Sequence, residues 1–158
     1  MAGARRLVSI LAALVALGVV AGVALAASTD TARQYRLAMK VPGRDVSDSL
    51  AAISDVQAKS LRYPLPPTAA LDAAAALKTV QGKLRHATPR LRAIEPPASV
   101  AKQHRLLLTG ALLLRAELTP IIAKLHKGQY AVVATLASLP GVVDLSSGLA
   151  GLRKNGFA

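Results

Sequence analysis

The chain of 158 residues contains no cysteine and no tryptophan. Without cysteine it can form neither a disulfide nor a thiolate metal site, and it lacks the lipid-modified cysteine that anchors bacterial lipoproteins. Aromatic residues make up only 3% of the sequence, so the core must be built from Leu, Val, Ile and Ala. Strand signals are nearly absent, and this composition favours helices packed at close range. Acidic residues number 8 against 20 Lys and Arg, which gives a formal net charge of +12.

The first 26 residues have the pattern of an export signal. Arg5 and Arg6 precede a 20-residue segment, residues 7–26, that is apolar apart from one serine. The segment ends in Ala24 and Ala26, a small-x-small arrangement that predicts a signal cleavage region. The two arginines predict an N-terminus on the cytoplasmic side of the membrane and the remainder of the chain on its outer side.

The same segment is consistent with two fates, and both stay open. It is longer than the roughly 7–15 residues usual for the apolar part of a cleaved signal, and it reaches the roughly 20 residues that span a bilayer. The protein is therefore expected either at the outer face of the membrane on a retained anchor, or secreted or in the cell wall after cleavage. Gly18 and Gly22 form a G-x-x-x-G, which either lets two anchors dimerise or is ordinary signal composition.

The remainder predicts one all-α domain, an antiparallel bundle of about four to five helices over residues 45–154. Residues 27–44 are expected to form a linker with a partial helix over 31–40 that ends before Pro42, and residues 155–158 a tail. Apolar residues at helical spacing predict helices over residues 45–61, 68–86, 99–127, 129–139 and 142–154. The uncharged run over residues 130–143 is too short to span a membrane and predicts a buried helix.

Proline and glycine mark the expected helix ends. Thr68 predicts an N-cap, and Thr88 followed by Pro89 predicts a new short helix that reaches residue 94. Pro120 predicts a kink or break in the longest helix. Gly128 and the pair at residues 155–156 predict C-terminal caps. Acidic residues are expected near helix starts, where they complement the helix dipole, as at Asp30, Asp45, Asp48 and Asp72.

Residues that carry chemistry are sparse. His86, His104 and His126 are 18 and 22 residues apart, a spacing that puts no two ligands on one helical face. Their neighbours favour surface or capping roles. Ser146 lies in no nucleophile motif. We therefore predict no catalytic residue, no cofactor and no metal, with enzymatic activity left open.

The opposing hypothesis is a small-ligand or enzymatic bundle with an inter-helix pocket. That pocket would lie between the helices predicted over residues 68–86 and 99–127, with polar groups converging near His104 and Glu117. Glu117 interrupts an apolar run, but Arg115 and Lys124 lie close in sequence and favour an exposed ion pair.

Basic residues concentrate between positions 78 and 105, where there are seven of them and Glu95 is the only acidic residue. The seven are Lys78, Lys83, Arg85, Arg90, Arg92, Lys102 and Arg105. Such a field predicts a contact surface for an anionic membrane, an acidic wall polymer or an acidic envelope protein, and the alternative is a generally solvated basic face. Nucleic acid fits the charge but not the compartment or the missing aromatic platforms.

Three short motifs suggest a family. They are residues 91–97 (LRAIEPP) leading into a helix with His104, residues 127–130 (KGQY) opening an alanine-rich helix, and residues 151–153 (GLR). In outline, over residues 45–154, the chain resembles the small exported all-helical proteins of unknown function from high-GC actinobacteria. The resemblance implies an exported helical fold and transfers no functional residue.

Overall fold

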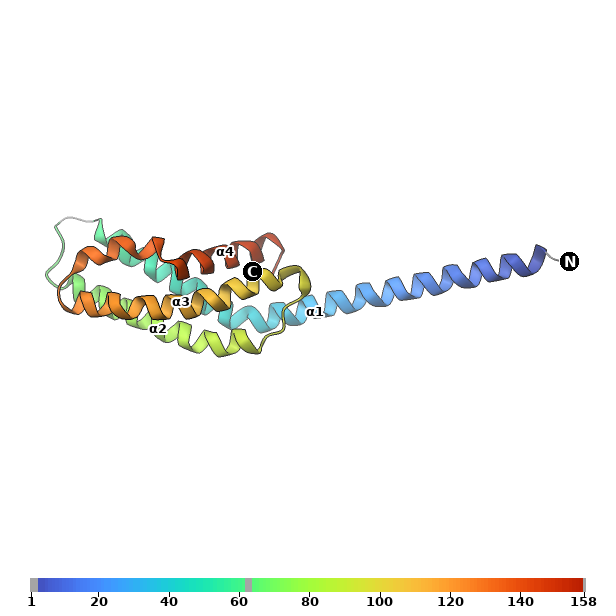
Figure 1. The fold of residues 1–158 in the computed structure, drawn as a ribbon, viewed down its shortest axis with the longest axis horizontal. Helices are drawn as coiled ribbons and strands as arrows, with labels where there is room; N and C mark the ends of the chain where they lie inside the picture. The colour runs from blue at the N-terminus through green and yellow to red at the C-terminus, as the bar shows by residue number, and fades with distance from the viewer. Residues whose placement is uncertain (1–2, 62–63, 158) are drawn as a thin grey trace. The chain divides into compact units, whose positions relative to one another are not determined.

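The computed structural model describes the backbone of residues 3–61 and 64–157 and the side chains of residues 29–61 and 64–157. Over these residues the protein is all-α and contains no strand. Its helices are α1 (Gly3–Ser60), α2 (Ala69–Ala93), α3 (Ala101–His126) and α4 (Pro140–Lys154), with short 3₁₀ helices η1 (Ala98–Val100) and η2 (Tyr130–Ser138) (Figure 1). The chain divides into two units, Met1–Gln34 and Tyr35–Ala158. We call the second the helical domain. The predicted cleavage region at Ala24 and Ala26, like the glycine pair at residues 18 and 22, lies outside the described side chains.

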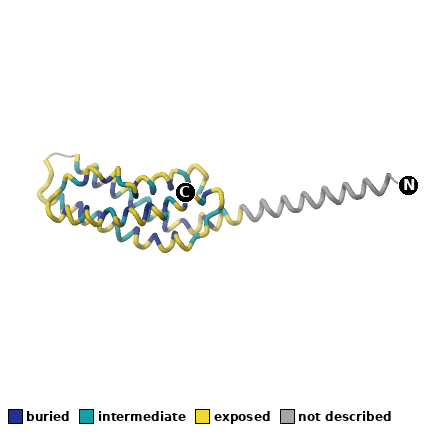
Figure 2. Tube along the Cα trace, viewed as in Figure 1, coloured by how far each residue is buried: buried dark blue, intermediate teal, exposed yellow. Residues whose placement is uncertain are grey.

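The core of the helical domain follows a regular spacing on its helices. Buried positions recur at alternating steps of four and three residues. On α1 they are Tyr35, Met39, Pro42, Val46, Ser49, Ile53 and Val56, and on α3 they are His104, Leu107, Ala111, Leu114, Leu118, Ile121 and Leu125. An average step of about 3.5 residues is typical of helices that pack along their length at shallow crossing angles. In the tube of Figure 2, buried and exposed residues alternate along the helices of the helical domain.

Helix α1 runs through Pro42, so the prediction of a short helix ending before this proline is wrong. The proline removes one backbone hydrogen bond, to the Ala38 carbonyl, at a cost of about 3 kcal/mol. Its ring is buried, and Met39 and Val46 are buried on the same face one turn to either side. Because each such side chain contributes about 1.5–3 kcal/mol on burial, packing offsets the lost hydrogen bond.

Prolines also lie inside α2 and α3. Helix α2 continues through Pro89 to its end, so the predicted separate helix there is wrong, and α3 is not broken at Pro120. One turn before Pro120, a side chain from α2 reaches the α3 backbone. The Gln81 side-chain amide donates to the Arg115 carbonyl and to the Thr119 hydroxyl, each at 2.9 Å. This contact ties α2 to α3 beside the position where α3 loses a hydrogen bond of its own.

The two predicted glycine caps are confirmed. Gly128 after α3 and Gly156 after α4 have φ values of 76° and 73°, a conformation that favours glycine. Beyond Gly156, the Phe157 N–H donates back to the Leu152 carbonyl at 2.9 Å, which is the Schellman arrangement. The turn brings the Phe157 ring edge-on to Tyr35, with 5.4 Å between the ring centroids.

Helices α3 and α4 approach each other closely at glycines. A Cβ atom on Gly141 would lie 2.7 Å from the Leu114 Cα. A Cβ atom on Gly110 would lie 2.9 Å from the Asp144 Cβ. Since neither position has room for a side chain, the absence of one lets the two backbones meet.

One described helical stretch, Ala98–His126, is long and apolar enough to cross a membrane. Its most apolar 18-residue window has a mean hydropathy of 1.6. Together, η2 and α4 meet the same criterion as a pair bent by 40°. Length and composition alone do not separate a span from a core helix, and Leu107, Leu114 and Leu118 of α3 are fully buried inside the helical domain. We therefore treat α3 as a core helix.

Candidate functional site

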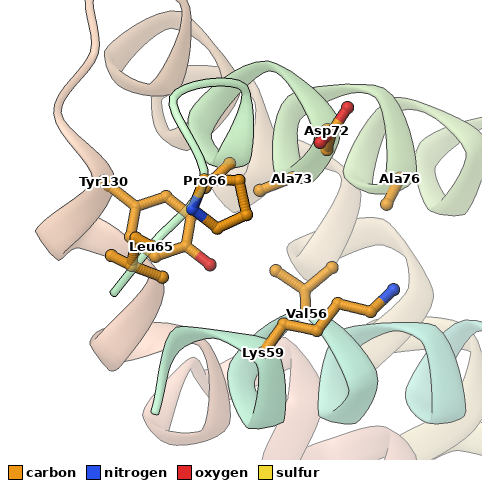
Figure 3. Close-up of a pocket in the computed structure, with 9 residues that line it drawn as sticks. Val56, Lys59, Leu65, Pro66, Asp72, Ala73, Ala76 and Tyr130 are labelled. Atoms are coloured by element: carbon orange, nitrogen blue, oxygen red, sulfur yellow. The ribbon is translucent and has the colours of Figure 1, made fainter. Parts of the chain in front are cut away.

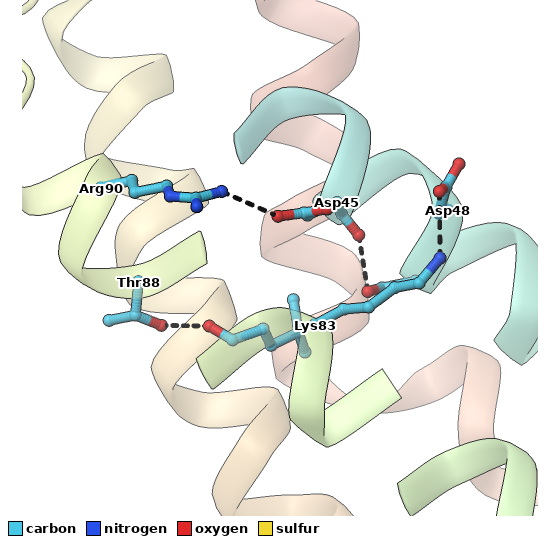
Figure 4. Close-up of polar contacts among 7 residues, drawn as sticks. Asp45, Asp48, Lys83, Thr88 and Arg90 are labelled. Atoms are coloured by element: carbon cyan, nitrogen blue, oxygen red, sulfur yellow. Dashed lines mark hydrogen bonds and ion pairs between the residues drawn. The ribbon is translucent and has the colours of Figure 1, made fainter. Parts of the chain in front are cut away.

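The fold divides the seven basic residues that the sequence predicted as one contact surface. Two of them pair with carboxylates of α1 (Figure 4). Lys83 Nζ lies 3.0 Å from Asp48 Oδ2, and an Arg90 guanidinium nitrogen lies 3.8 Å from Asp45 Oδ2. Both pairs are partly exposed, so each is worth about 0–1 kcal/mol. They align α2 with α1 and offset two charges of the predicted surface. Asp45 and Asp48 lie inside α1, not at the start of a helix as predicted.

Two other members of the set meet at a hollow between α2 and α3, which we call the α2–α3 hollow. Lys78 and Arg85 line it together with Arg115, and its volume is about 630 Å³. No carboxylate is among its lining residues. Sequence reasoning missed Arg115 because Glu117 lay close by as its expected partner. The remaining three residues of the set, Arg92, Lys102 and Arg105, are exposed near the end of α2 and the start of α3, and none lines this hollow.

A second depression, the α1–α4 groove, has a volume of about 420 Å³ and combines basic and apolar residues. Its lining residues are Arg36, Leu37, Met39, Lys40, Gly43, Arg44, Ser47, Asp48, Leu149, Leu152, Arg153 and Phe157. The sequence analysis placed most of its α1 residues in a linker. The signal that could have found them is the recurrence of basic residues at steps of four, at positions 36, 40 and 44.

A third hollow, of about 230 Å³, lies between the end of α1, the start of α2 and η2 (Figure 3). Val56, Ala73 and Tyr130 contribute to its mainly apolar lining. Two of its lining residues are charged, and both have partners. Lys59 Nζ lies 2.7 Å from the Asp55 carboxylate, and the Asp72 carboxylate accepts a hydrogen bond from the Thr68 hydroxyl. Thr68 precedes α2 as predicted, but its hydroxyl caps no backbone group.

His104 is buried, only 5% exposed, and the prediction of a surface or capping role is wrong. Its Nε2 lies 2.8 Å from the Leu91 carbonyl, which can only accept, so Nε2 carries the proton. Nδ1 therefore accepts the hydrogen bond from the Tyr35 hydroxyl, at 3.0 Å. Burial lowers the pKa of His104, although its hydrogen bond to Leu91 acts in the opposite direction, and burial raises the pKa of Tyr35 to about 12. The result is an uncharged, fully bonded network that holds α1, α2 and α3 together.

Glu117 also has a role that differs from the prediction. Its Oε2 accepts a hydrogen bond from the Gly141 N–H, at 3.1 Å, in the first turn of α4. The first N–H groups of a helix lack partners within it and carry partial positive charge, so a carboxylate is favoured there. Among the described side chains Glu117 forms no ion pair with Arg115 or Lys124. Neither Glu117 nor His104 lines any of the three depressions.

Family models, curated proteins and solved structures give no match to this chain. In the part of the chain with described side chains, no three His, Asp or Glu residues are grouped to hold a metal ion, and His86 and His126 are exposed. The three depressions carry positive charge and apolar side chains.

Proposed function

We propose that this chain is a non-enzymatic binding module of the cell envelope, an antiparallel helical bundle whose basic surface binds an anionic component there. The observation that carries the proposal is the α2–α3 hollow, in which Lys78, Arg85 and Arg115 line one concavity without a carboxylate. Like charges held together on a rigid scaffold attract anions, and two guanidinium forks suit phosphate oxygens. Without a bound anion, the three like charges repel one another and destabilise the fold.

The location rests on residues 1–26, whose pattern supports export with the bundle outside the cytoplasmic membrane. A retained anchor would keep the module at the membrane surface, and cleavage near Ala26 would release it to the wall or medium. In either place it meets anionic head groups, acidic wall polymers and acidic envelope proteins. Of these, a phosphate polymer suits the α2–α3 hollow best, because its repeating charges can meet three cations at once.

The test uses the full-length protein in nanodiscs of phosphatidylcholine, a neutral lipid, with soluble poly(glycerol phosphate) as the probe. Biolayer interferometry measures the dissociation constant of the polymer. The variant K78E/R85E/R115E should weaken binding by about tenfold or more. Higher salt should weaken binding by the wild type. The matched control is K40E/R44E/R153E, which makes the same change in net charge on the α1–α4 groove and should keep the wild-type constant within about twofold.

Two outcomes would contradict the proposal. Equal weakening in both variants would show that net charge matters and the α2–α3 hollow does not. Wild-type affinity in K78E/R85E/R115E would remove the hollow as a binding site. Circular dichroism melting curves check folding, and K78Q/R85Q/R115Q replaces the charge-reversed variant where that variant does not fold.

A small-ligand module is the second candidate, favoured by the apolar hollow beside Val56 and Tyr130. Its volume of about 230 Å³ lies just below the roughly 300–1,000 Å³ usual for ligand pockets, so only a small apolar group would fit. The neutral fluorophore 1-aminoanthracene should bind the wild type, and Ala76→Leu should abolish the fluorescence increase by filling the hollow. No binding to the wild type would remove this candidate.

A further inference from the structure

The floor of the α1–α4 groove is apolar in a way that recognition of charge alone does not require. Met39 of α1 and Leu149 and Leu152 of α4 lie beneath it and are at most 5% exposed, so they line the groove but leave little free surface of their own. On its edge, Leu37 is 65% exposed. Apolar surface beside water is stabilised when an apolar group covers it. The α2–α3 hollow, by contrast, is lined mainly by polar and charged side chains.

The rim of the same groove is basic. Lys40, Arg44 and Arg153 are exposed, and among the described side chains none has a carboxylate within ion-pair distance. The one carboxylate that lines the groove, Asp48, is bonded to Lys83 at 3.0 Å. Among the described residues, no carboxylate therefore offsets the charges of Lys40, Arg44 and Arg153 beside the apolar floor. An occupant that satisfies both must carry an anionic group and a hydrocarbon part.

The chain also limits how far this groove can lie from a membrane. Leu37 follows Ala26, the end of the apolar N-terminal segment, by eleven residues. Even fully extended, eleven residues span only about 40 Å. If the segment stays in the bilayer, the groove is held within that distance of the lipid head groups. The local concentration of lipid is then high, and that of a soluble amphiphile is not.

We propose that the α1–α4 groove binds one anionic phospholipid of the membrane in which the chain is anchored. The phosphate lies on Lys40, Arg44 and Arg153, and the upper part of an acyl chain packs against Leu37 at the edge of the apolar floor. The volume of about 420 Å³ falls within the range of about 300–1,000 Å³ usual for ligand sites. The inference rests on the anchored form of the proposed function. A second copy of the chain is disfavoured as the occupant because two equally basic rims would repel each other.

The test counts lipids bound to the full-length protein by native mass spectrometry. The protein is purified in dodecyl maltoside and mixed with equal amounts of dioleoyl phosphatidylglycerol and dioleoyl phosphatidylcholine, which share their chains and differ in charge. We expect one phosphatidylglycerol to be retained in preference to phosphatidylcholine. K40E/R44E/R153E should lower this retention by about fivefold or more. K78E/R85E/R115E, with the same change in net charge, should retain the lipid as the wild type does.

A further arm tests the hydrocarbon part separately from charge. Leu37→Asn changes no charge, and its position is exposed enough to leave the core intact. This variant should lower retention of phosphatidylglycerol and leave binding of poly(glycerol phosphate) unchanged. Glycerol 3-phosphate, an anion without acyl chains, should fail to displace the lipid.

Equal retention of the two lipids, or wild-type retention by K40E/R44E/R153E, would overturn the inference. So would loss of lipid in K78E/R85E/R115E alone, an outcome that assigns the membrane contact to the α2–α3 hollow and leaves the proposed function standing. A dimer in the wild-type spectrum that K40E/R44E/R153E abolishes would assign the groove to a second copy of the chain. Conversely, failure of poly(glycerol phosphate) to bind, with lipid retention intact, would reject the polymer site and keep the groove. Folding is checked by circular dichroism, and K40Q/R44Q/R153Q serves where charge reversal prevents folding.

Discussion

The Tyr35 hydroxyl donates to His104 Nδ1 over 3.0 Å inside the core, between residues 69 positions apart in the sequence. The opposite ring nitrogen is fixed by the Leu91 carbonyl. One imidazole thus joins the start of the helical domain in α1 to the end of α2 and the first turn of α3. Because both nitrogens are satisfied, the polar group is tolerated in a mainly apolar core.

Tyr35→Phe should destabilise the helical domain. The change removes only the hydroxyl and leaves His104 Nδ1 buried without a donor, which costs about 1–3 kcal/mol in the free energy of unfolding. Urea unfolding followed by circular dichroism measures the difference. Tyr130→Phe is the control, because the Tyr130 hydroxyl forms no hydrogen bond among the described residues, and it should change stability by less than about 0.5 kcal/mol.

The stability of the protein should fall as the pH drops below 6.5. Burial lowers the pKa of His104 in the folded state, so the unfolded chain, which titrates near 6.5, takes up a proton before the native state does. The contribution is fully present above pH 6.5 and is lost as the pH falls through the folded-state pKa. Urea unfolding of the wild type and of His104→Gln between pH 8 and pH 5 measures this contribution as the difference between their free energies of unfolding. A difference that does not change with pH would contradict this prediction.

At the alkaline end, Tyr35 should act in the corresponding way. Burial raises its pKa from 10.0 to about 12, so between these values the unfolded chain loses the proton that the folded protein keeps. The free energy of unfolding should therefore decline as the pH rises through this window. Tyr35→Phe should show a smaller decline, and an identical alkaline profile for the two proteins would argue against the assignment.

Gly141→Ala and Gly82→Ala should have opposite effects although each adds one methyl group. A Cβ at Gly141 would lie 2.7 Å from the Leu114 Cα, so α3 and α4 must separate, at a cost of about 1–3 kcal/mol. A Cβ at Gly82 meets nothing within 4 Å, and alanine in the middle of α2 should add about 0.5–1 kcal/mol. Thermal unfolding of the two variants side by side measures both changes. Similar melting temperatures would contradict the close approach of α3 and α4.

Pro120→Ala should stabilise the protein. Pro120 is exposed in the interior of α3, and alanine restores the hydrogen bond to the Ala116 carbonyl without adding volume to the core. Part of this gain is lost because alanine raises the conformational entropy of the unfolded chain. The expected increase in the free energy of unfolding is about 1–3 kcal/mol. Guanidinium chloride unfolding measures it. A decrease would mean that the proline ring itself contributes packing at this position.

The helical character, the core stripes and the glycine caps could be read from the sequence because each depends on local spacing. The stripe through Val46, Ile53 and Val56 and the caps at Gly128 and Gly156 are examples, although Leu61, at the end of the predicted stripe, is 86% exposed. Three interior prolines could not be read in the same way. At Pro42, local rules predict an end, and only burial of Met39 and Val46 against other helices carries the helix across.

The candidate site was predictable in composition but not in arrangement. Lys78 and Arg85 were found as part of a basic stretch. Their companion Arg115 comes from α3, and the register between two helices decides that they share a hollow. His104 was misread because Lys102 and Arg105 suggested a surface position, whereas its steps of three and seven residues to Leu107 and Ala111 place it on the buried stripe.

The edge-on contact between Tyr35 and Phe157 affects the order in which the protein is assembled. The two rings come from opposite ends of the helical domain. Because the chain is synthesised from its N-terminus, Tyr35 is available for packing long before Phe157. Until residue 157 emerges, the Tyr35 side of the core remains accessible to water, chaperones and proteases. Closing so long a loop is slow compared with forming the helices themselves. Phe157 can therefore pack on Tyr35 only after the rest of the domain has been synthesised, and the last turn closes this corner of the core.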